Sequence, residues 1–441
     1  MELKRQIGLA GGIAMVVGGV IGMGAFVLIP IICAKAGSAA WLAVSIALIT
    51  SLLSVFPLIQ LSSAYPVAGG GFEYGRKFLS PFTGILFSWW SIIGGAAAVA
   101  LVAFGLVESF KAYLPPNISM HLLSILLVLM FYAFYLLGIK FLMLLQVLMS
   151  VQMLLALLLY TIPVLQKFGG NAAFSLPQND NFFMAIVFSF NICLGFQIIM
   201  ELGEEMENPK RNIPLSLIIG AAIILVIYLM TIAAYSGIVG QGNLALKPEM
   251  VGTANRLLPQ WAIVFIRIGV LSAGLTCFNG AAIAIPREVL AQARAGILPE
   301  VFARINKNGT PQYAVSLFFV AVCLMLLLGE LLEQTKILQF FFGTDTIEFY
   351  GFLTIFGMMT LTIGISLAAW KLPSIAPQLY QNAYIRFSKF WLALFVTISI
   401  LSSLFLILLV STKWIVPLIF AMLTLLIWLV FRKRASPPQS S

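Results

Sequence analysis

Two glycine-containing stretches inside apolar segments hold the residues best suited to binding a charged molecule. Residues 18–26 read GGVIGMGAF and residues 191–195 read NICLG. Each glycine weakens a helix by about 1 kcal/mol relative to alanine, so both stretches favour a break in a helix. Inside a bilayer, the backbone N–H and C=O groups that a break exposes must be satisfied by protein or by a ligand. Both stretches are therefore candidate binding sites built from backbone atoms.

The two breaks would bind groups of opposite charge. A break at 21–24 presents N–H groups at the start of a half-helix, where the helix dipole is positive and favours a carboxylate. A break at 191–195 frees carbonyl groups at the end of a half-helix, and these suit an ammonium group. Together the two breaks predict a site for an amino acid.

Two other interpretations of the first stretch stay open. Gly18 and Gly22 form a GxxxG pattern, which is typical of close packing between membrane helices. The glycine spacing at 19–24 is also that of a nucleotide-binding loop, although this stretch follows no predicted strand.

Ionisable and polar residues within apolar segments form a second group of candidates, for coupling or gating. Arg267 is predicted either to pair with Asp345 or Glu348, or to leave one of these acids free for a cationic group or a coupling proton. Glu201 precedes an acidic run, and this run is either a solvated helix end or a gate. The residues of this group are Glu201, Glu204, Glu205, Arg267, Asp345, Glu348 and Gln152.

The elements that must position these residues are apolar and long. The chain has 441 residues, of which 61% are hydrophobic and only 9% charged, whereas a soluble domain has about 25% charged residues. A membrane-spanning helix needs about 20 apolar residues. The pattern predicts an all-α polytopic membrane protein with twelve spans, at 8–36, 38–65, 82–110, 121–139, 142–165, 182–206, 213–238, 260–286, 312–330, 336–369, 389–411 and 414–431.

The positions of the two breaks indicate an internal repeat. Five spans separate them, and interrupted segments at matching positions of two halves are typical of transporter binding sites. We expect a first repeat at 1–165, a second and inverted repeat at 166–370, two additional spans at 371–431 and a disordered cytoplasmic tail at 432–441.

The net charge of +10 follows from membrane topology and indicates no nucleic-acid partner. If the N terminus is cytoplasmic, 17 of the 25 Lys and Arg residues lie on the cytoplasmic side. This bias predicts a multi-pass protein of the inner or plasma membrane with both termini in the cytoplasm. The four cysteines show no metal-ligand spacing, and we expect no metal or cofactor. His121, the only histidine, is expected to be solvated or interfacial and without a role.

Three polar stretches resemble the signatures of the amino acid–polyamine–organocation permeases. They read PVAGGGFEYGRKFLSPFTG at 66–84, EEMENPKRNIP at 204–214 and REVLAQARAGILPEVFARINKNGTP at 287–311. Their order, spacing and side of the membrane agree with that family over about residues 5–370. The resemblance implies the leucine-transporter fold and alternating access.

The resemblance also implies a role for each residue of the two breaks. Ile21, Gly22, Met23 and Gly24 would hold the substrate carboxylate. Carbonyl groups for the substrate amine would come from Phe190, Asn191, Ile192 and Cys193, with Gly195 permitting the break.

Two departures from the family limit what the resemblance implies. Span five lacks the lysine that often replaces a sodium ion in proton-coupled members, and its polar residues are Gln146, Ser150 and Gln152. Coupling to H⁺, coupling to Na⁺ and exchange therefore all stay open. The second break lacks the family's aromatic residues, so the identity of the substrate is not implied.

The sequence thus predicts a secondary transporter of amino acids or related amines, and no enzyme, because it shows neither a nucleophile–base pair nor a phosphate loop. A channel, a non-transporting sensor or scaffold of the same fold, and a polyamine transporter are the alternatives. Its partners are a small-molecule substrate and the lipid bilayer, and the oligomeric state is left open.

Overall fold

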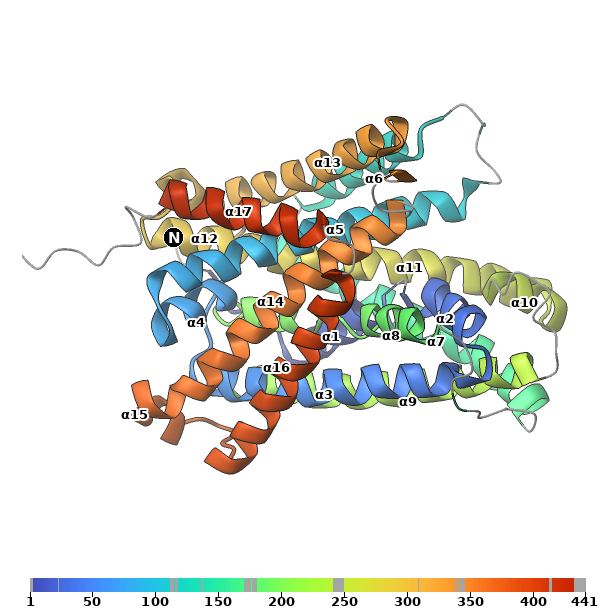
Figure 1. Ribbon diagram of the computed structural model, residues 1–441, viewed down its shortest axis with the longest axis horizontal. Coiled ribbons are helices and arrows are strands. Elements are labelled where there is room, and N and C mark those ends of the chain that lie inside the picture. The colour runs from blue at the N-terminus through green and yellow to red at the C-terminus, as the bar shows by residue number, and fades with distance from the viewer. Residues whose placement is uncertain are drawn as a thin grey trace, which may run out of the picture.

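The computed structural model shows an elongated bundle of helices (Figure 1). It describes residues 3–22, 24–111, 115, 118–135, 138–169, 176, 181–240, 250–307, 309–337, 339–340, 346–411 and 415–431. Within these ranges the chain forms helices and two isolated backbone bridges, and no strand.

Nine helical stretches of the described residues are long and apolar enough to cross a membrane. The first includes α1 (Leu9–Ile21), α2 (Gly24–Ala36) and α3 (Ala40–Ala64), which make two crossings joined by the turn η1 (Gly37–Ala39). The others contain α5 (Pro81–Ser109), α7 (Ile139–Phe168), α8 (Phe182–Asn191) with η4 (Phe196–Glu201), α9 (Pro209–Gly240), α11 (Gln260–Ala284), α13 (Gln312–Gln334), α14 (Thr346–Ile375) and α16 (Lys389–Ser411). Two shorter apolar helices, α6 (Met120–Tyr135) and α17 (Ile415–Phe431), bring the crossing segments to the predicted twelve.

The tenth span differs from its expected limits. It was expected at 336–369, but α14 begins at Thr346 and continues to Ile375. Residues 339–340 are helical, and residues 341–345, between them and α14, lie outside the described residues. Pro373 lies in the last turn of α14 and does not end the helix earlier.

α1 lies at the centre of the bundle, where it contacts α7, α9, α11 and η4. Around it, α14 packs along α5 and α16, and α3 packs along α9. One large hydrophobic cluster of buried side chains connects these helices. The first break, which ends α1, is therefore surrounded by helices.

Residues 3–8 lie at one end of the bundle together with α4 (Gly70–Phe78), α12 (Pro286–Arg294) and α15 (Pro377–Gln381), at the left of Figure 1. We call this end the N-terminal face. The short helix α10 (Met250–Leu257) lies at the opposite end, and η6 (Glu300–Ala303) follows α12 in the chain.

Candidate functional site

The first break separates α1 from α2. α1 ends at Ile21, α2 begins at Gly24, and Met23 lies outside the described residues. Gly22 has φ +40° and ψ −156°, a conformation that residues with a side chain rarely adopt. A Cβ atom on Gly22 would lie 3.2 Å from the Cβ of Cys277 on α11. The backbone angles at this position therefore strongly favour glycine, and an added Cβ would also crowd Cys277.

The second break lies between α8 and η4. α8 ends at Asn191, a turn follows, and the chain continues as the 3-10 helix η4. Gly195 has φ +121°, and a Cβ on it would lie only 2.5 Å from the carbonyl oxygen of Gly19. The backbone of the second break therefore lies directly against the backbone of α1.

Further contacts hold the two breaks together. A Cβ on Gly24 would lie 3.0 Å from Cγ2 of Ile192. The buried Tyr228 of α9 has its hydroxyl group 2.5 Å from the carbonyl oxygen of Ile192 and 3.3 Å from that of Val20. Tyr228 thus connects one carbonyl from each broken segment. Sequence reasoning missed it, and the only available signal was a single tyrosine in the apolar run 222–230.

Two of the carbonyl groups expected to bind the amine already accept hydrogen bonds within the turn. The carbonyl oxygen of Phe190 accepts the N–H of Cys193 at 3.0 Å, and that of Asn191 accepts the N–H of Leu194 at 3.4 Å. The Asn191 amide nitrogen lies 3.7 Å from the position of a Cβ on Gly351 of α14. Each carbonyl oxygen keeps a second lone pair with which it can accept a ligand N–H.

Side chains of α7 and α11 donate hydrogen bonds to two carbonyl groups of α1. The Ala14 oxygen accepts hydrogen bonds from Gln146 Nε2 at 3.2 Å and Ser150 Oγ at 3.1 Å. The Gly18 oxygen accepts one from Thr276 Oγ1 at 3.2 Å. The neutral hydrogen-bond donors Gln146 and Ser150 thus contact α1 from α7, which contains the predicted fifth span. A side chain at Gly18 would clash with all three of these groups, so this glycine also serves close packing.

The remaining candidates that the structure describes lie on α7, α11 and α14. Gln152 donates from Nε2 to the carbonyl oxygen of Phe265 on α11 at 3.1 Å. Arg267 lies on an exposed face of α11, and Glu348 is half-buried in the first turn of α14. Asp345 lies outside the described residues. Coupling or gating roles for these four residues stay predictions.

The acidic run after η4 binds two arginines of α12 at the N-terminal face. Glu205 and Arg287 form a two-point ion pair, with Nη2–Oε1 at 2.8 Å and Nε–Oε2 at 2.9 Å, and both side chains are at most 1% exposed. Glu204 pairs with Arg294 at 2.7 Å, each about one third exposed. The interpretation of the run as a solvated helix end is therefore wrong for Glu205.

Glu201 is buried at the end of η4, next to Glu288 of α12. Sequence reasoning missed Glu288, because an acid beside an arginine in a polar stretch is normally solvated. Its neighbour Glu201 was a candidate, because an ionisable residue within an apolar segment is unusual.

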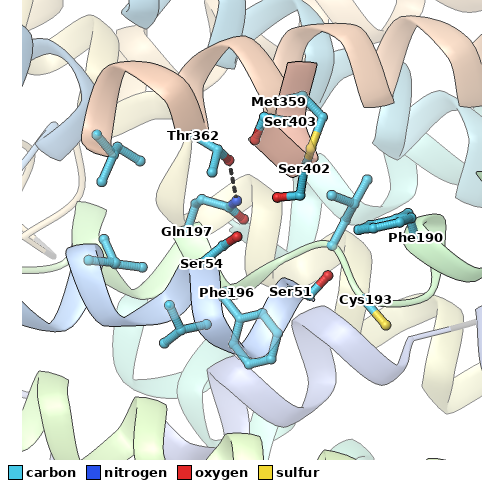
Figure 2. A pocket seen from close by; sticks show the side chains of 14 residues that line it. Ser51, Ser54, Phe190, Cys193, Phe196, Gln197, Met359, Thr362, Ser402 and Ser403 are labelled. Atoms are coloured by element: carbon cyan, nitrogen blue, oxygen red, sulfur yellow. Dashed lines mark hydrogen bonds between the residues drawn. The ribbon is translucent and has the colours of Figure 1, made fainter. Parts of the chain in front are cut away.

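A small pocket adjoins the second break on the flank opposite α1 (Figure 2). α3, α14 and α16 contribute most of its other walls, and Gln197 spans it by donating from Nε2 to Thr362 Oγ1 at 2.9 Å. Its volume is about 30 Å³, which is room for about two water molecules and too little for an amino acid. Its other polar lining residues are Ser51, Ser54, Ser402 and Ser403.

His121 contradicts the expectation of a solvated residue. It is only 3% exposed, its Nδ1 lies 2.9 Å from Oε2 of Glu330, and its ring lies 4.6 Å from that of Phe104. The apolar packing of α6 against α5 and α13 encloses it.

Comparisons with known proteins agree with this architecture. The family model described as "Amino acid permease" matches residues 11–435. An uncharacterized transporter of Mycobacterium tuberculosis is 27% identical over 330 residues, covering 73% of each chain. The cystine/glutamate transporter of Homo sapiens is 25% identical over 77% of this chain and 71% of its own. The large neutral amino acids transporter small subunit 2 of Oryctolagus cuniculus is 26% identical over 89% and 75%. With its many apolar helices, this chain is a multi-pass membrane protein with the leucine-transporter fold, and it belongs to the amino acid permease family.

Proposed function

We propose that this protein is a secondary transporter that carries amino acids across a cell membrane by alternating access. The observation that carries the proposal is the contact of two interrupted helices, Gly195 against Gly19, which no side chain could permit. Membership in the permease family and relatives named as amino acid transporters support it.

In this proposal the backbone of the two breaks binds the charged groups of the substrate. The first N–H groups of α2, from Gly24 onward, lack partners within their helix and receive the carboxylate. Carbonyl groups at 190–193 receive the ammonium group. The halves 1–165 and 166–370 form the inverted repeat, and the N-terminal face is the cytoplasmic side.

The surroundings of the breaks favour a substrate with an uncharged side chain. The described side chains that contact them there are neutral, namely Ile192, Ile198, Tyr228 and Cys277. A third charge on the substrate would have no counter-ion from these residues and would carry a desolvation cost. We therefore propose neutral amino acids ahead of polyamines.

Counterflow in proteoliposomes tests this function. Vesicles preloaded with an unlabelled neutral amino acid should accumulate the same labelled amino acid. Gly22→Leu should abolish this uptake, because the side chain fills the break and is strained at φ +40°. Gly37→Ala is the matched control, since Gly37 has φ +56° but no atom within 4 Å of an added Cβ. Specific binding without counterflow would instead favour a sensor, and uptake retained by Gly22→Leu would exclude this site.

A further inference from the structure

Two buried carboxyl groups meet at the N-terminal face. Glu201 ends η4 and is 3% exposed, and Glu288 lies in the first turn of α12 and is 0% exposed. Neither takes part in an ion pair among the residues that the structure describes. Isolated buried carboxylates are costly, so this pair needs another source of stabilisation.

Backbone N–H groups at the start of α4 bind one oxygen of each carboxyl group. The N–H of Phe72 donates to Oε2 of Glu288 at 2.9 Å, and that of Gly71 donates to Oε1 of Glu201 at 3.4 Å. The remaining oxygens, Glu201 Oε2 and Glu288 Oε1, are buried and have no hydrogen-bond partner among the described residues. The two carboxyl groups lie close together, because they bind the adjacent N–H groups of Gly71 and Phe72. Two buried carboxyl groups this close together, with no cation paired to either, cannot both be ionised, so the pair holds one proton.

The groups around the pair provide no positive charge to replace that proton. Arg287 is adjacent in sequence, but its guanidinium group binds Glu205 and the hydroxyl of Tyr135. Ser88, from α5, contacts Glu288 and also accepts a hydrogen bond from Gln292 Nε2 at 2.7 Å.

The remaining neighbour, Tyr74 of α4, is neutral. Burial is the main reason why the pKa of Tyr74 lies well above its usual value. The nearby side chains of Glu201, Tyr65 and Glu288 raise this pKa further. Its buried hydroxyl group has no hydrogen-bond partner. The hydroxyl group of Tyr74 therefore does not compete for the proton of the pair.

The pair joins the same two parts of the bundle as the ion pairs Glu205–Arg287 and Glu204–Arg294. In each of the three contacts one residue lies on η4 or the segment after it, and the other lies on α12. The two ion pairs attract at any pH near neutrality. The two acids attract only while they share a proton, and they repel when both are ionised.

We propose that Glu201 and Glu288 together form a proton-binding site that couples closure of the N-terminal face to one proton. The pair takes its proton from the extracellular side while the N-terminal face is closed and releases it to the cytoplasm as η4 and α12 separate, with no other bond made or broken. This inference rests on the proposed transport function, and it identifies the coupling ion of that function as H⁺.

Proton movement in proteoliposomes tests the coupling. With an amino acid gradient imposed, a pH-sensitive dye inside the vesicles should report proton movement with the wild-type protein. Glu288→Gln and Glu201→Gln should each lose this movement but keep counterflow, because a glutamine amide donates to the remaining carboxylate without a proton. Glu300→Gln is the control, since Glu300 is an exposed acid on η6. Undiminished proton movement in both test variants would overturn the proposal, whereas absent counterflow in the wild type would overturn the transport function itself.

The thermal stability of the purified protein tests proton binding independently of transport. The folded pair holds a proton that the unfolded chain releases, so stability should fall as pH rises above the range in which an exposed glutamate is protonated. Glu288→Gln should flatten this dependence, and Glu300→Gln should not. Equal pH dependence in the wild type and Glu288→Gln would count against the site.

Discussion

The centre of the bundle and its N-terminal face are held together by opposite means. At the centre, the broken helices approach through backbone atoms, and glycines such as Gly19, Gly22 and Gly195 make the approach possible. At the N-terminal face, buried and half-exposed side-chain charges connect η4 and its following segment to α12. Backbone contacts are fixed in geometry and do not titrate, whereas charge contacts can break and re-form. In the proposed function, the first region recognises the substrate and the second serves as the gate.

The largest effect on stability should come from breaking the buried ion pair. Arg287→Met leaves the Glu205 carboxylate buried and unpaired, which costs about 3–5 kcal/mol. Replacing both partners, as in Arg287→Met with Glu205→Leu, should recover most of that loss. Thermal unfolding of the purified variants measures both effects.

The transport activity of the double variant tests whether the buried ion pair serves the gate. If the pair serves the gate, the double variant should fold and bind amino acid, while its transport rate and the exposure of the N-terminal face change. If the double variant transports amino acid at the wild-type rate, the Glu205–Arg287 pair serves only packing.

The next largest effect should come from Gly195→Ala. Strain at φ +121° alone costs about 1–3 kcal/mol, and the new Cβ pushes the second break away from Gly19. Amino acid binding, measured by ligand-induced thermal stabilisation, should be lost. Gly296→Ala is the control, because Gly296 has φ +74° and no atom within 4 Å of an added Cβ. If the two variants bind equally well, the close approach of the breaks is not needed for recognition.

A smaller effect should follow from Tyr228→Phe. The variant removes the hydroxyl group that contacts the Val20 and Ile192 carbonyls, and a hydrogen bond of this kind contributes about 1 kcal/mol. Unfolding with and without amino acid separates its effects on the fold and on the site. Tyr160→Phe, which alters another buried tyrosine, on α7, provides a comparison. Unchanged stability and affinity in Tyr228→Phe would show that the hydroxyl does not hold the breaks.

The smallest effect should come from Glu204→Gln. Because the Glu204–Arg294 pair is about one third exposed, its loss should cost less than about 1 kcal/mol, and added salt should reduce the difference further. Unfolding at low and high salt measures this. A loss as large as that of Arg287→Met would contradict the contrast between the buried and exposed pairs.

The sequence predicted those features of the structure that depend on local interactions. Apolar length predicted the twelve spans, and glycine composition located residues 21–24 and 191–195, because helix length and backbone freedom are properties of a short segment. Partners distant in sequence were not predictable, as with Tyr228 against Ile192 or Glu288 beside Glu201. His121 was misjudged for the same reason, since its burial depends on α5 and α13.

The most direct test of backbone recognition is an experimental density map of the purified protein with a bound neutral amino acid. The account predicts interrupted helices at residues 21–24 and 191–195, the substrate carboxylate at the first N–H groups of α2, and its amino group at the carbonyls of 190–193. Continuous helices through both positions, or an amino acid bound only through charged side chains elsewhere, would contradict it.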